Sequence, residues 1–350
     1  EAFRKVRREI GISMPTLAHR RQETGDRRQE RIEGFATDPS TVENRGTGRL
    51  EAPKFPGGTI RPDMPPGCRI PSMTGGSSLA ASPGTRAVSV RKRDGTEVSD
   101  FVAVEAPLEI RVGGRPLVIT MRTPGHDEEL TAGFLYAEGV VTSGDQIVSI
   151  RTEPGSGVSD PEALAAGKVG SGDRVLVELR GAPDPGAVQR AQRDFRATAA
   201  CGVCGKESLE DLDQALPPIT RVECATDLLG RLPERMRPHQ TLFEATGGIH
   251  AAGLFTLEGE LLSVREDIGR HNAVDKVIGR AVLDGATSLA DRILVVSGRA
   301  GFELVQKALK AAIPVMVSVG AASSLAVDMA SAAGMTLYSF VGAGRGNLHV

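Results

Sequence analysis

Apolar residues along this 350-residue chain follow two successive patterns, and neither begins before about residue 87. The first pattern is an alternation of apolar and polar residues, as in Leu108 to Met121 around Gly113-Gly114 and in Val88 to Val90 before Asp94-Gly95. A period of two interrupted by glycine turns is typical of paired strands. We therefore expect two hairpins in this part of the chain.

A helix and a further strand are predicted to follow these hairpins. Thr123-Pro124 precedes an acidic stretch at Asp127 to Glu129, and an apolar stripe then runs from Leu130 to Leu135 before Gly139. Proline at a helix start, acidic residues in the first turn and glycine at the end predict a capped helix. With the strand expected at Val175 to Leu179, residues 87–195 are predicted to form a small α+β domain.

From about residue 251 the second pattern alternates unbroken apolar runs with helical stripes. The helical stripes lie at Val274 to Val282, at Leu304 to Ala312 and around Leu325 and Met329. Apolar runs without alternation are typical of strands buried on both faces. We therefore expect residues 221–350 to form a three-layer α/β/α domain, with ligands bound at loops beyond the strand ends. The predicted strands are Ala251 to Leu257, Leu261 to Val264, Ile293 to Val296, Val315 to Val319 and Thr336 to Val341.

Residues 1–86 follow neither pattern, being first rich in Arg and then rich in Pro, Gly, Ser and Thr. Such a composition predicts a largely disordered, solvated extension. Since the sequence given starts at Glu1, we expect a functional start nearer to Met14, Met64 or Met73.

Charge and cysteine content narrow the class of protein. The formal net charge is −2 with 25% charged residues of both signs, which gives no overall field to attract nucleic acid or an anionic membrane. Four cysteines in 350 residues are too few for a disulfide framework. No apolar run approaches the ~20 residues that cross a bilayer. We expect a cytoplasmic protein.

The segment Cys201-Gly202-Val203-Cys204-Gly205-Lys206 is the main candidate for chemistry. It lies in a region, 196–220, that has neither the strand nor the helix period, and a glycine follows each cysteine. Glycine allows close approach of a second molecule, and Lys206 favours the thiolate. We interpret 196–220 as a mobile loop with a nucleophilic thiol, for which a CxxC pattern leaves dithiol exchange, half a zinc site and persulfide carriage open.

The sequence lacks a feature that each of the zinc and redox alternatives requires. A zinc site needs further ligands, and Cys224, His239 or His250 would have to supply them without a second CxxC. Thioredoxin-like chemistry places the CxxC at the start of a helix, but no apolar stripe follows Lys206. Sulfur carriage is therefore favoured, and no bound metal is expected.

A second group of candidate residues gathers where predicted strands end. The run Arg265-Glu266-Asp267-Ile268-Gly269-Arg270-His271-Asn272 joins a strand to a helix, and it predicts either an anion site at the helix start or a salt-bridged capping segment. Several Gly-rich turns on one sheet also favour a pocket for an extended, nucleotide-like phosphorylated ligand. These turns are Gly247-Gly248, Ser297-Gly298-Arg299, Gly320 to Ser324, and Gly342-Ala343-Gly344-Arg345.

Taken in order, the motifs of this chain resemble those of the formate dehydrogenase accessory sulfurtransferases of the FdhD/NarQ type. The motifs are Cys-Gly-Val-Cys-Gly, Gly-Gly-Ile-His-Ala-Ala-Gly (with Gly247, Gly248 and His250), Arg-Glu-Asp-Ile-Gly-Arg-His-Asn-Ala-Val-Asp-Lys, and Ser-Gly-Arg. The resemblance covers about residues 87–350. It implies a cytidine-deaminase-like fold for the C-terminal domain.

The resemblance also implies a function. Sulfur would pass as a persulfide from a cysteine desulfurase through Cys201, with Cys204 assisting, to a molybdenum cofactor in its bis(molybdopterin guanine dinucleotide) form, which formate dehydrogenase then receives. In the segment Phe340-Val341-Gly342-Ala343-Gly344-Arg345, Phe340 would stack on guanine and Arg345 would contact phosphate. The small residues from Ser331 to Gly334 would allow close packing across a homodimer. The alternatives are a cofactor chaperone without catalysis, and a zinc-dependent hydrolase.

Overall fold

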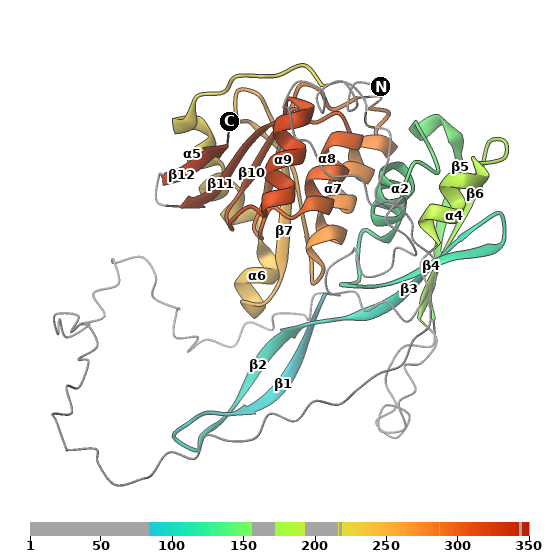
Figure 1. The fold of residues 1–350 in the computed structure, drawn as a ribbon. Coiled ribbons are helices and arrows are strands. Elements are labelled where there is room, and N and C mark those ends of the chain that lie inside the picture. Colours follow the sequence, from blue (N-terminus) through green and yellow to red (C-terminus); the bar gives the residue numbers. More distant parts are fainter. Residues whose placement is uncertain are drawn as a thin grey trace, which may run out of the picture. The chain divides into compact units, whose positions relative to one another are not determined.

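Two sheets and one separate ribbon contain the strands of the described chain (Figure 1). The structure, a computed structural model, describes residues 84–155, 172–192, 216, 219–286, 288–342 and 345–349, which belong to one unit, Gly75–Val350. The predicted extension 1–86 lies outside these residues except at its end. The predicted domain boundaries near residues 87, 196 and 221 stay predictions.

The two predicted hairpins are present and form different structures. Strands β1 (Thr85–Arg91) and β2 (Glu97–Ala103) make a two-stranded antiparallel ribbon. Strands β3 (Ala106–Val112) and β4 (Arg115–Arg122) join β6 (Asp173–Leu179) and β5 (Ile147–Glu153) in a sheet of order β4-β3-β6-β5. Apolar residues of this sheet pack against α2 (Asp127–Ala137) and α4 (Pro185–Ala191) to form the small α+β core.

The larger sheet has the order β12-β11-β10-β9-β7-β8. Its members are β7 (His250–Thr256), β8 (Leu261–Asp267), β9 (Arg292–Val296), β10 (Val315–Ser318), β11 (Thr336–Gly342) and β12 (Arg345–His349). Strands β9, β10 and β11 are parallel, whereas β7, β8 and β12 each run antiparallel to their neighbours.

Helices cover both faces of this sheet. Along β9, Leu294 and Val296 pack in the core shared with α7 (Arg270–Leu283), α8 (Phe302–Lys310) and α9 (Ser324–Ala333). Ile293 and Val295 point to the other face and pack with α5 (Thr226–Met236). Since successive side chains of a strand alternate between faces, burial on both faces explains the unbroken apolar runs. The predicted three-layer α/β/α fold is confirmed.

Helices α2 and α7 cross at unusually short range and join the two sheets' cores. A β-carbon at Gly133 of α2 would lie 1.9 Å from the main-chain oxygen of Asp275, and one at Gly279 of α7 would lie 1.8 Å from that of Glu129. No larger residue fits either position without moving a helix. The small α+β core and the three-layer core are therefore in direct backbone contact.

Some elements were absent from the sequence-based prediction. Strand β12 lacks an apolar pattern, because Leu348 is its one aliphatic side chain. It pairs with β11 through an irregular register. Helix α5 contains Pro233 inside it, and α6 (Thr241–Thr246) has only six residues, so neither has a long helical stripe. The helix expected to reach Ala312 ends at Lys310, and Ala312 itself has a left-handed φ of 58°.

Candidate ligand site at the strand ends

Most of the candidate binding residues meet at one edge of the larger sheet. The parallel strands β9, β10 and β11 end there at Val296, Ser318 and Gly342. Strand β7 is antiparallel to β9, so its first residue, His250, reaches the same edge and pairs with Asp267 at the end of β8. This topology brings together residues that are almost 100 positions apart in the sequence. We call this edge of the sheet, with the loops beyond β9, β10 and β11, the strand-end site.

The loops beyond β9, β10 and β11 are tied to one another by main-chain hydrogen bonds. The amide of Gly320 donates to the oxygen of Gly298 at 2.9 Å, and the amide of Phe340 donates to the oxygen of Gly320 at 2.9 Å. Ser318 Oγ donates to the oxygen of Gly298 at 2.8 Å. A β-carbon at Gly320 would lie 2.8 Å from that same oxygen, so glycine is required there. The Gly-rich turns therefore form one connected surface.

Phe340 has an unusual conformation within this surface. Its φ is 58°, and 65% of the surface of the residue is exposed. A left-handed φ is unfavourable for a bulky residue, and exposing a large aromatic ring gains no burial. The hydrogen bond to Gly320 holds the backbone in place. The conformation presents an aromatic face to solvent beside the ends of the strands.

Two pockets open at the strand-end site. The first, which we call the α6 pocket, has a volume of about 700 Å³ and is mostly apolar. Its lining residues are Pro233, Glu234, Met236, Arg237, Gln240, Phe243, Gly247, Gly248, Ile249, His250, Ile268, Ser297, Val319, Val341 and Gly342. The second, the Phe340 pocket, has a volume of about 810 Å³ and is lined by Val319, Tyr338, Phe340, Val341, Gly342, Arg345, Gly346 and Asn347. The pockets share Val319, Val341 and Gly342, so they are neighbours.

His250 lies at the wall of the α6 pocket, in surroundings that favour the neutral form of its imidazole. Burial lowers the pKa of His250 from its ordinary value of 6.5, and the positive charges of Arg270 and His271 lower it further against the smaller opposing effect of Asp267. Gly298 lies against the ring, since a β-carbon there would be 3.4 Å from Nδ1. A neutral imidazole offers one donor and one acceptor to a ligand.

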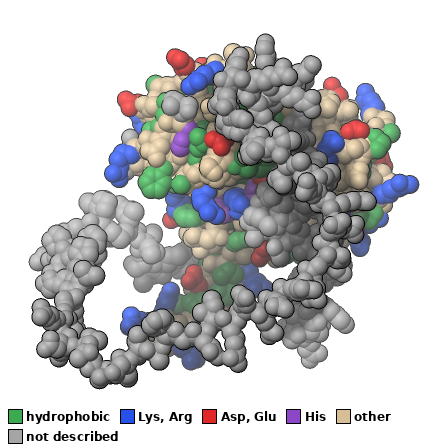
Figure 2. All heavy atoms as spheres, in the orientation of Figure 1, with side chains coloured by type: hydrophobic (Ala, Val, Ile, Leu, Met, Phe, Trp, Pro, Cys, Tyr) green, Lys and Arg blue, Asp and Glu red, His purple; other side chains and the backbone are tan. Residues whose placement is uncertain are grey.

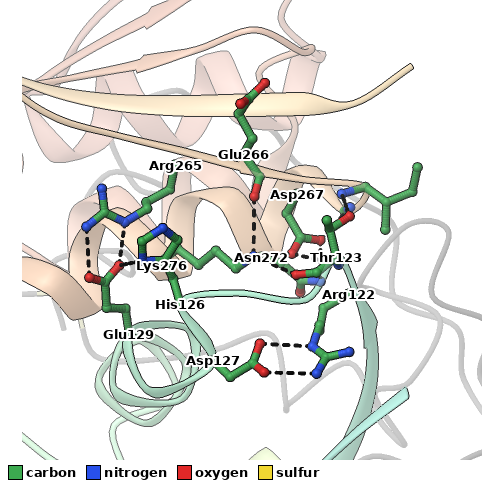
Figure 3. A network of polar contacts seen from close by, with 12 residues as sticks. Arg122, Thr123, His126, Asp127, Glu129, Arg265, Glu266, Asp267, Asn272 and Lys276 are labelled. Carbon is green, nitrogen blue, oxygen red and sulfur yellow. Dashed lines mark hydrogen bonds and ion pairs between the residues drawn. The ribbon is translucent and has the colours of Figure 1, made fainter. Parts of the chain in front are cut away.

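Asp267 and Asn272 are turned away from the pockets into a buried network (Figure 3). The carboxylate of Asp267 is fully buried, and it accepts hydrogen bonds from Thr123 N at 3.1 Å, Gly269 N at 2.8 Å and Asn272 Nδ2 at 2.9 Å. The ammonium of Lys276 lies 2.7 Å from it. These contacts fix the turn between β8 and α7 against the small sheet.

Arg265 takes part in a second set of contacts between the two cores. Its guanidinium donates to both carboxylate oxygens of Glu129 on α2, and His126 Nδ1 lies 3.4 Å from the same carboxylate (Figure 3). Although burial opposes ionisation, the hydrogen bonds from Arg265 and His126 lower the pKa of Glu129 to about 2. Of the two interpretations of this motif, ion pairing and hydrogen bonding describe the geometry of Arg265, Asp267 and Asn272, whereas no described side chain caps the start of α7.

The remaining charged candidates lie nearer to the surface of the site. His271 Nε2 pairs with Glu303 of α8 at 2.9 Å, which anchors the first turn of α7. Arg270 is partly buried, and its β-carbon is 3.9 Å from where one would lie on Gly298. Arg299 and Arg345 are exposed. These three arginines surround the strand ends, where they can meet a negatively charged ligand.

Several of the predicted site residues lie outside the described residues. Cys201 and Cys204, and also Ala343 and Gly344, are among them. Cys224 is half-buried, and burial, with a smaller effect of Glu258, raises the pKa of its thiol. Within residues 84–349 as far as the structure describes them, no three His, Cys, Asp or Glu side chains are grouped to hold a metal ion.

The α6 pocket also contains residues that the sequence patterns did not single out. Arg237 lies over the ring of Phe243, 4.4 Å from its centroid. Gln240, which lies between these two residues in the sequence, also lines the pocket. They lie on short helical segments without a clear period. The adjacent Gly247-Gly248 turn was the one signal that pointed to this wall.

Acidic and basic side chains are interspersed over the face seen in Figure 2, without a large region of one sign. The described chain contains no helix that is long and apolar enough to cross a membrane. The fold and site thus define a three-layer α/β protein with two neighbouring pockets at the carboxyl ends of parallel strands.

The chain belongs to the FdhD/NarQ family, whose model matches residues 103–349. It is 46% identical over 264 residues to the sulfur carrier protein FdhD of Streptomyces avermitilis, covering 72% of this chain and 88% of that protein. It is 48% identical over 256 residues to the protein of that name from Corynebacterium efficiens, covering 71% and 87%.

A solved structure shows the same fold. It is a Desulfotalea psychrophila protein assigned as a formate dehydrogenase accessory protein, with a TM-score of 0.55 and 24% identity, covering 76% of this chain and 95% of that one.

Proposed function

We propose that this protein is a sulfurtransferase that accepts sulfur as a persulfide on Cys201 and delivers it to the molybdenum cofactor required by formate dehydrogenase. The observation that carries the proposal is the identity of 46% and 48% to sulfur carrier proteins, together with a family match over residues 103–349, which include both the CxxC segment and the strand-end site. A cysteine desulfurase would supply the sulfur, in a reducing cytoplasm where thiols stay reduced.

The first chemical step is a thiol–persulfide exchange. The Cys201 thiolate attacks the terminal sulfur of the donor persulfide, so that a new S–S bond forms on Cys201. The donor's own S–S bond breaks, and the donor cysteine leaves as a thiolate with the bonding electron pair. The exchange is redox-neutral and needs a deprotonated Cys201, which the neighbouring Lys206 favours. Cys204 assists as the second thiol of the pair.

The cofactor is proposed to bind at the strand-end site as the bis(molybdopterin guanine dinucleotide) substrate. Phe340 stacks on a guanine, and Arg270, Arg299 and Arg345 contact the phosphates together with amides of the Gly-rich turns. Asp267 and Asn272 contribute by fixing the loop that carries Arg270. The connected loops and the two neighbouring pockets of about 700 and 810 Å³ support an extended ligand with two arms.

A homodimer is proposed on the basis of the small residues at the end of α9. Ser331 and Ala332 are exposed, and Gly334 ends the helix in a left-handed conformation. A surface of small side chains allows two copies to approach closely.

Mass spectrometry of the full chain after incubation with a cysteine desulfurase and cysteine tests the function. We expect a mass increase of one sulfur atom on Cys201, which is lost in Cys201→Ala and kept in the control Cys224→Ala. Cys201→Ala should fail to activate formate dehydrogenase while still binding the cofactor. Full activation by Cys201→Ala would instead establish a chaperone that delivers the cofactor without carrying sulfur.

Zinc analysis of the purified protein addresses the third alternative. Stoichiometric zinc that disappears in Cys201→Ala or Cys204→Ala would support a zinc-dependent hydrolase and contradict the sulfur-transfer proposal.

A further inference from the structure

The small α+β core has a groove of its own, separate from the strand-end site. The groove has a volume of about 440 Å³ and lies between the turn that joins β3 to β4, the end of β6 and helix α4. Its apolar lining includes Val112, Leu117, Leu179, Pro183 and Val188. In the described chain it shares no lining residue with either strand-end pocket, and we call it the α4 groove.

Helix α4, which lies against the small sheet, has two different faces (Figure 1). Ala187 and Ala191 are 1% and 0% exposed and pack in the small core. Val188, Gln189 and Gln192 line the groove instead. Residues three and four positions apart lie on the same side of a helix, so each of these two groups forms a continuous strip. The alanines hold α4 on the sheet, and the second strip is available for a contact outside the core.

The apolar lining of the groove is incompletely covered. Leu117 is buried, whereas Val112, Leu179 and Val188 are half-buried. Covering such side chains is favourable because it removes apolar surface from water. Gly113 lines one end with a φ of 55°, and no described atom lies within 4 Å of where its β-carbon would be. A partner's main chain can therefore approach closely, and the groove suits an extended segment with an apolar side chain.

Two arginines give the edge of the groove a positive charge. Arg115 lines the groove, Arg180 directly follows a lining residue, and both are exposed. Within the part of the chain that the structure describes, neither guanidinium forms an ion pair, whereas Arg190 of α4 lies 3.7 Å from Asp184. The charge is local, since the whole chain has a formal net charge of −2. Arginines beside an apolar groove favour a partner segment that carries carboxylates.

The groove adjoins the point where the chain enters the CxxC segment. Gln192, which ends α4, lines the groove, and Cys201 follows it by nine positions. Nine residues span at most about 30 Å, even when fully extended. A protein bound in the groove is therefore within reach of the thiol that receives sulfur in the proposed function.

We propose that the α4 groove is the docking surface for the sulfur donor, and that it binds an extended segment of the donor in which carboxylates flank an apolar side chain. The apolar side chain covers the half-buried lining residues, and the carboxylates pair with Arg115 and Arg180. Docking raises the local concentration of the donor persulfide near Cys201 and leaves the exchange itself unchanged. The proposal rests on the proposed function for the identity of the donor, a cysteine desulfurase.

Two measurements on the full chain with a purified cysteine desulfurase test this surface. Calorimetry gives the affinity, and mass spectrometry gives the initial rate at which Cys201 gains sulfur from subsaturating desulfurase. We expect both to fall about tenfold when Arg115→Glu and Arg180→Glu are combined, and about threefold in Val188→Ala. Added salt should weaken binding of the wild type more than binding of the double variant, because its charge pairs are screened.

Matched variants and a small sulfur donor separate docking from other effects. Arg93→Glu in the exposed turn between β1 and β2, and Val148→Ala at a 58% exposed position of β5, should bind and load as the wild type does. Sodium polysulfide needs no docking surface. The Cys201 thiolate attacks a terminal sulfur of the polysulfide, the shorter polysulfide leaves, and all variants should react at the wild-type rate.

The outcomes that overturn the proposal are distinct. Wild-type protein that does not bind desulfurase, or groove variants with unchanged affinity, would contradict it. Slower polysulfide loading in the groove variants would show that the groove supports the CxxC segment instead. A sedimentation coefficient that changes in the groove variants alone would show that it binds a second copy of the chain.

The same samples distinguish this inference from the proposed function. Sulfur on wild-type Cys201 together with unchanged desulfurase affinity in the groove variants contradicts the docking surface alone. Weakened binding in the groove variants together with an unmodified wild-type Cys201 supports the docking surface and contradicts the sulfur-transfer step alone.

Discussion

The main-chain amide of Thr123 donates a hydrogen bond of 3.1 Å to the buried carboxylate of Asp267, 144 positions further along the chain. Thr123 Oγ1 in turn accepts from the amide of Ile268 at 3.1 Å, and the Thr123 oxygen accepts from Lys276 Nζ at 2.9 Å. Thr123 precedes the helix that carries Glu129, and Ile268 lines the α6 pocket. Thr123 and Asp267 thus connect the small sheet to the strand-end site, beside the contact between Arg265 and Glu129.

Asp267→Asn should strongly destabilise the protein. The change leaves the Lys276 ammonium, which is 1% exposed, without its counter-ion, and breaking a buried ion pair costs about 3–5 kcal/mol. Urea unfolding of the variant measures the loss. Asp284→Asn is the control, because its 2.7 Å pair with Arg280 is exposed and its removal should cost less than about 1 kcal/mol. Equal stability of the two variants would contradict the role given to Asp267.

Gly279→Ala should separate α2 from α7. The new methyl group would lie 1.8 Å from the oxygen of Glu129, so a helix must move, and we expect a loss of about 3 kcal/mol or more in the free energy of unfolding. Gly186→Ala in α4 is the matched control, since its methyl group meets side-chain atoms alone, the flexible end of Arg190 at 3.3 Å and the carboxylate of Asp184 at 3.5 Å. Because alanine is the better helix former, that variant should be as stable as the wild type or more so. A tolerated Gly279→Ala would mean that the crossing is looser than described.

Glu129 should make stability dependent on pH below about 4.5. Its pKa is lowered from 4.5 to about 2 in the folded state, so its contribution is fully present above pH 4.5 and is lost as the pH falls toward 2. The shift corresponds to about 3 kcal/mol as an upper value. Unfolding free energies measured between pH 6 and 2 should fall less steeply for Glu129→Gln than for the wild type. The control Glu128→Gln, at the exposed neighbouring position, should keep the wild-type slope. A wild-type slope in Glu129→Gln would show that Glu129 is not the source of the pH dependence.

Phe340→Gly should raise stability or leave it unchanged, which is unusual for the loss of an aromatic side chain. Glycine adopts a φ of 58° without the ~1–2 kcal/mol cost that other residues bear, and the exposed ring contributes little burial. Thermal unfolding compares it with Leu325→Gly, an exposed position inside α9 where glycine should cost about 1 kcal/mol. A larger loss in Phe340→Gly than in Leu325→Gly would show that the ring packs against the protein.

Much of the fold was predictable because its strands and helices have strong periods. The runs Ile293 to Val296 and Val315 to Val317 are apolar at every position, since both faces of β9 and β10 are covered. Strand β12 was not predictable, because its pairing with β11 depends on main-chain hydrogen bonds that leave no apolar pattern in Arg345 to His349.

The positions of the glycines in the site could be predicted from the sequence, but the contacts of its charged residues could not. Gly298, Gly320 and Gly342 do lie at the ends of adjacent parallel strands, as the turns indicated. The motif around Arg265 and Asp267 allowed two interpretations that sequence spacing cannot separate. Which side chains face the pocket depends on Thr123 and Glu129, more than 130 positions away.

The sequence was sufficient to specify the strands and helices that have a strong period, the glycine turns, the CxxC segment and the resemblance to the family. Each of these depends on local period, local backbone freedom or a short motif. Tertiary contacts were needed to show that Asp267 is buried against Lys276, that Phe340 is exposed, and that Gln240 lines the α6 pocket. Burial and hydrogen-bond partners are properties of contacts between distant residues, and for that reason a local pattern does not specify them.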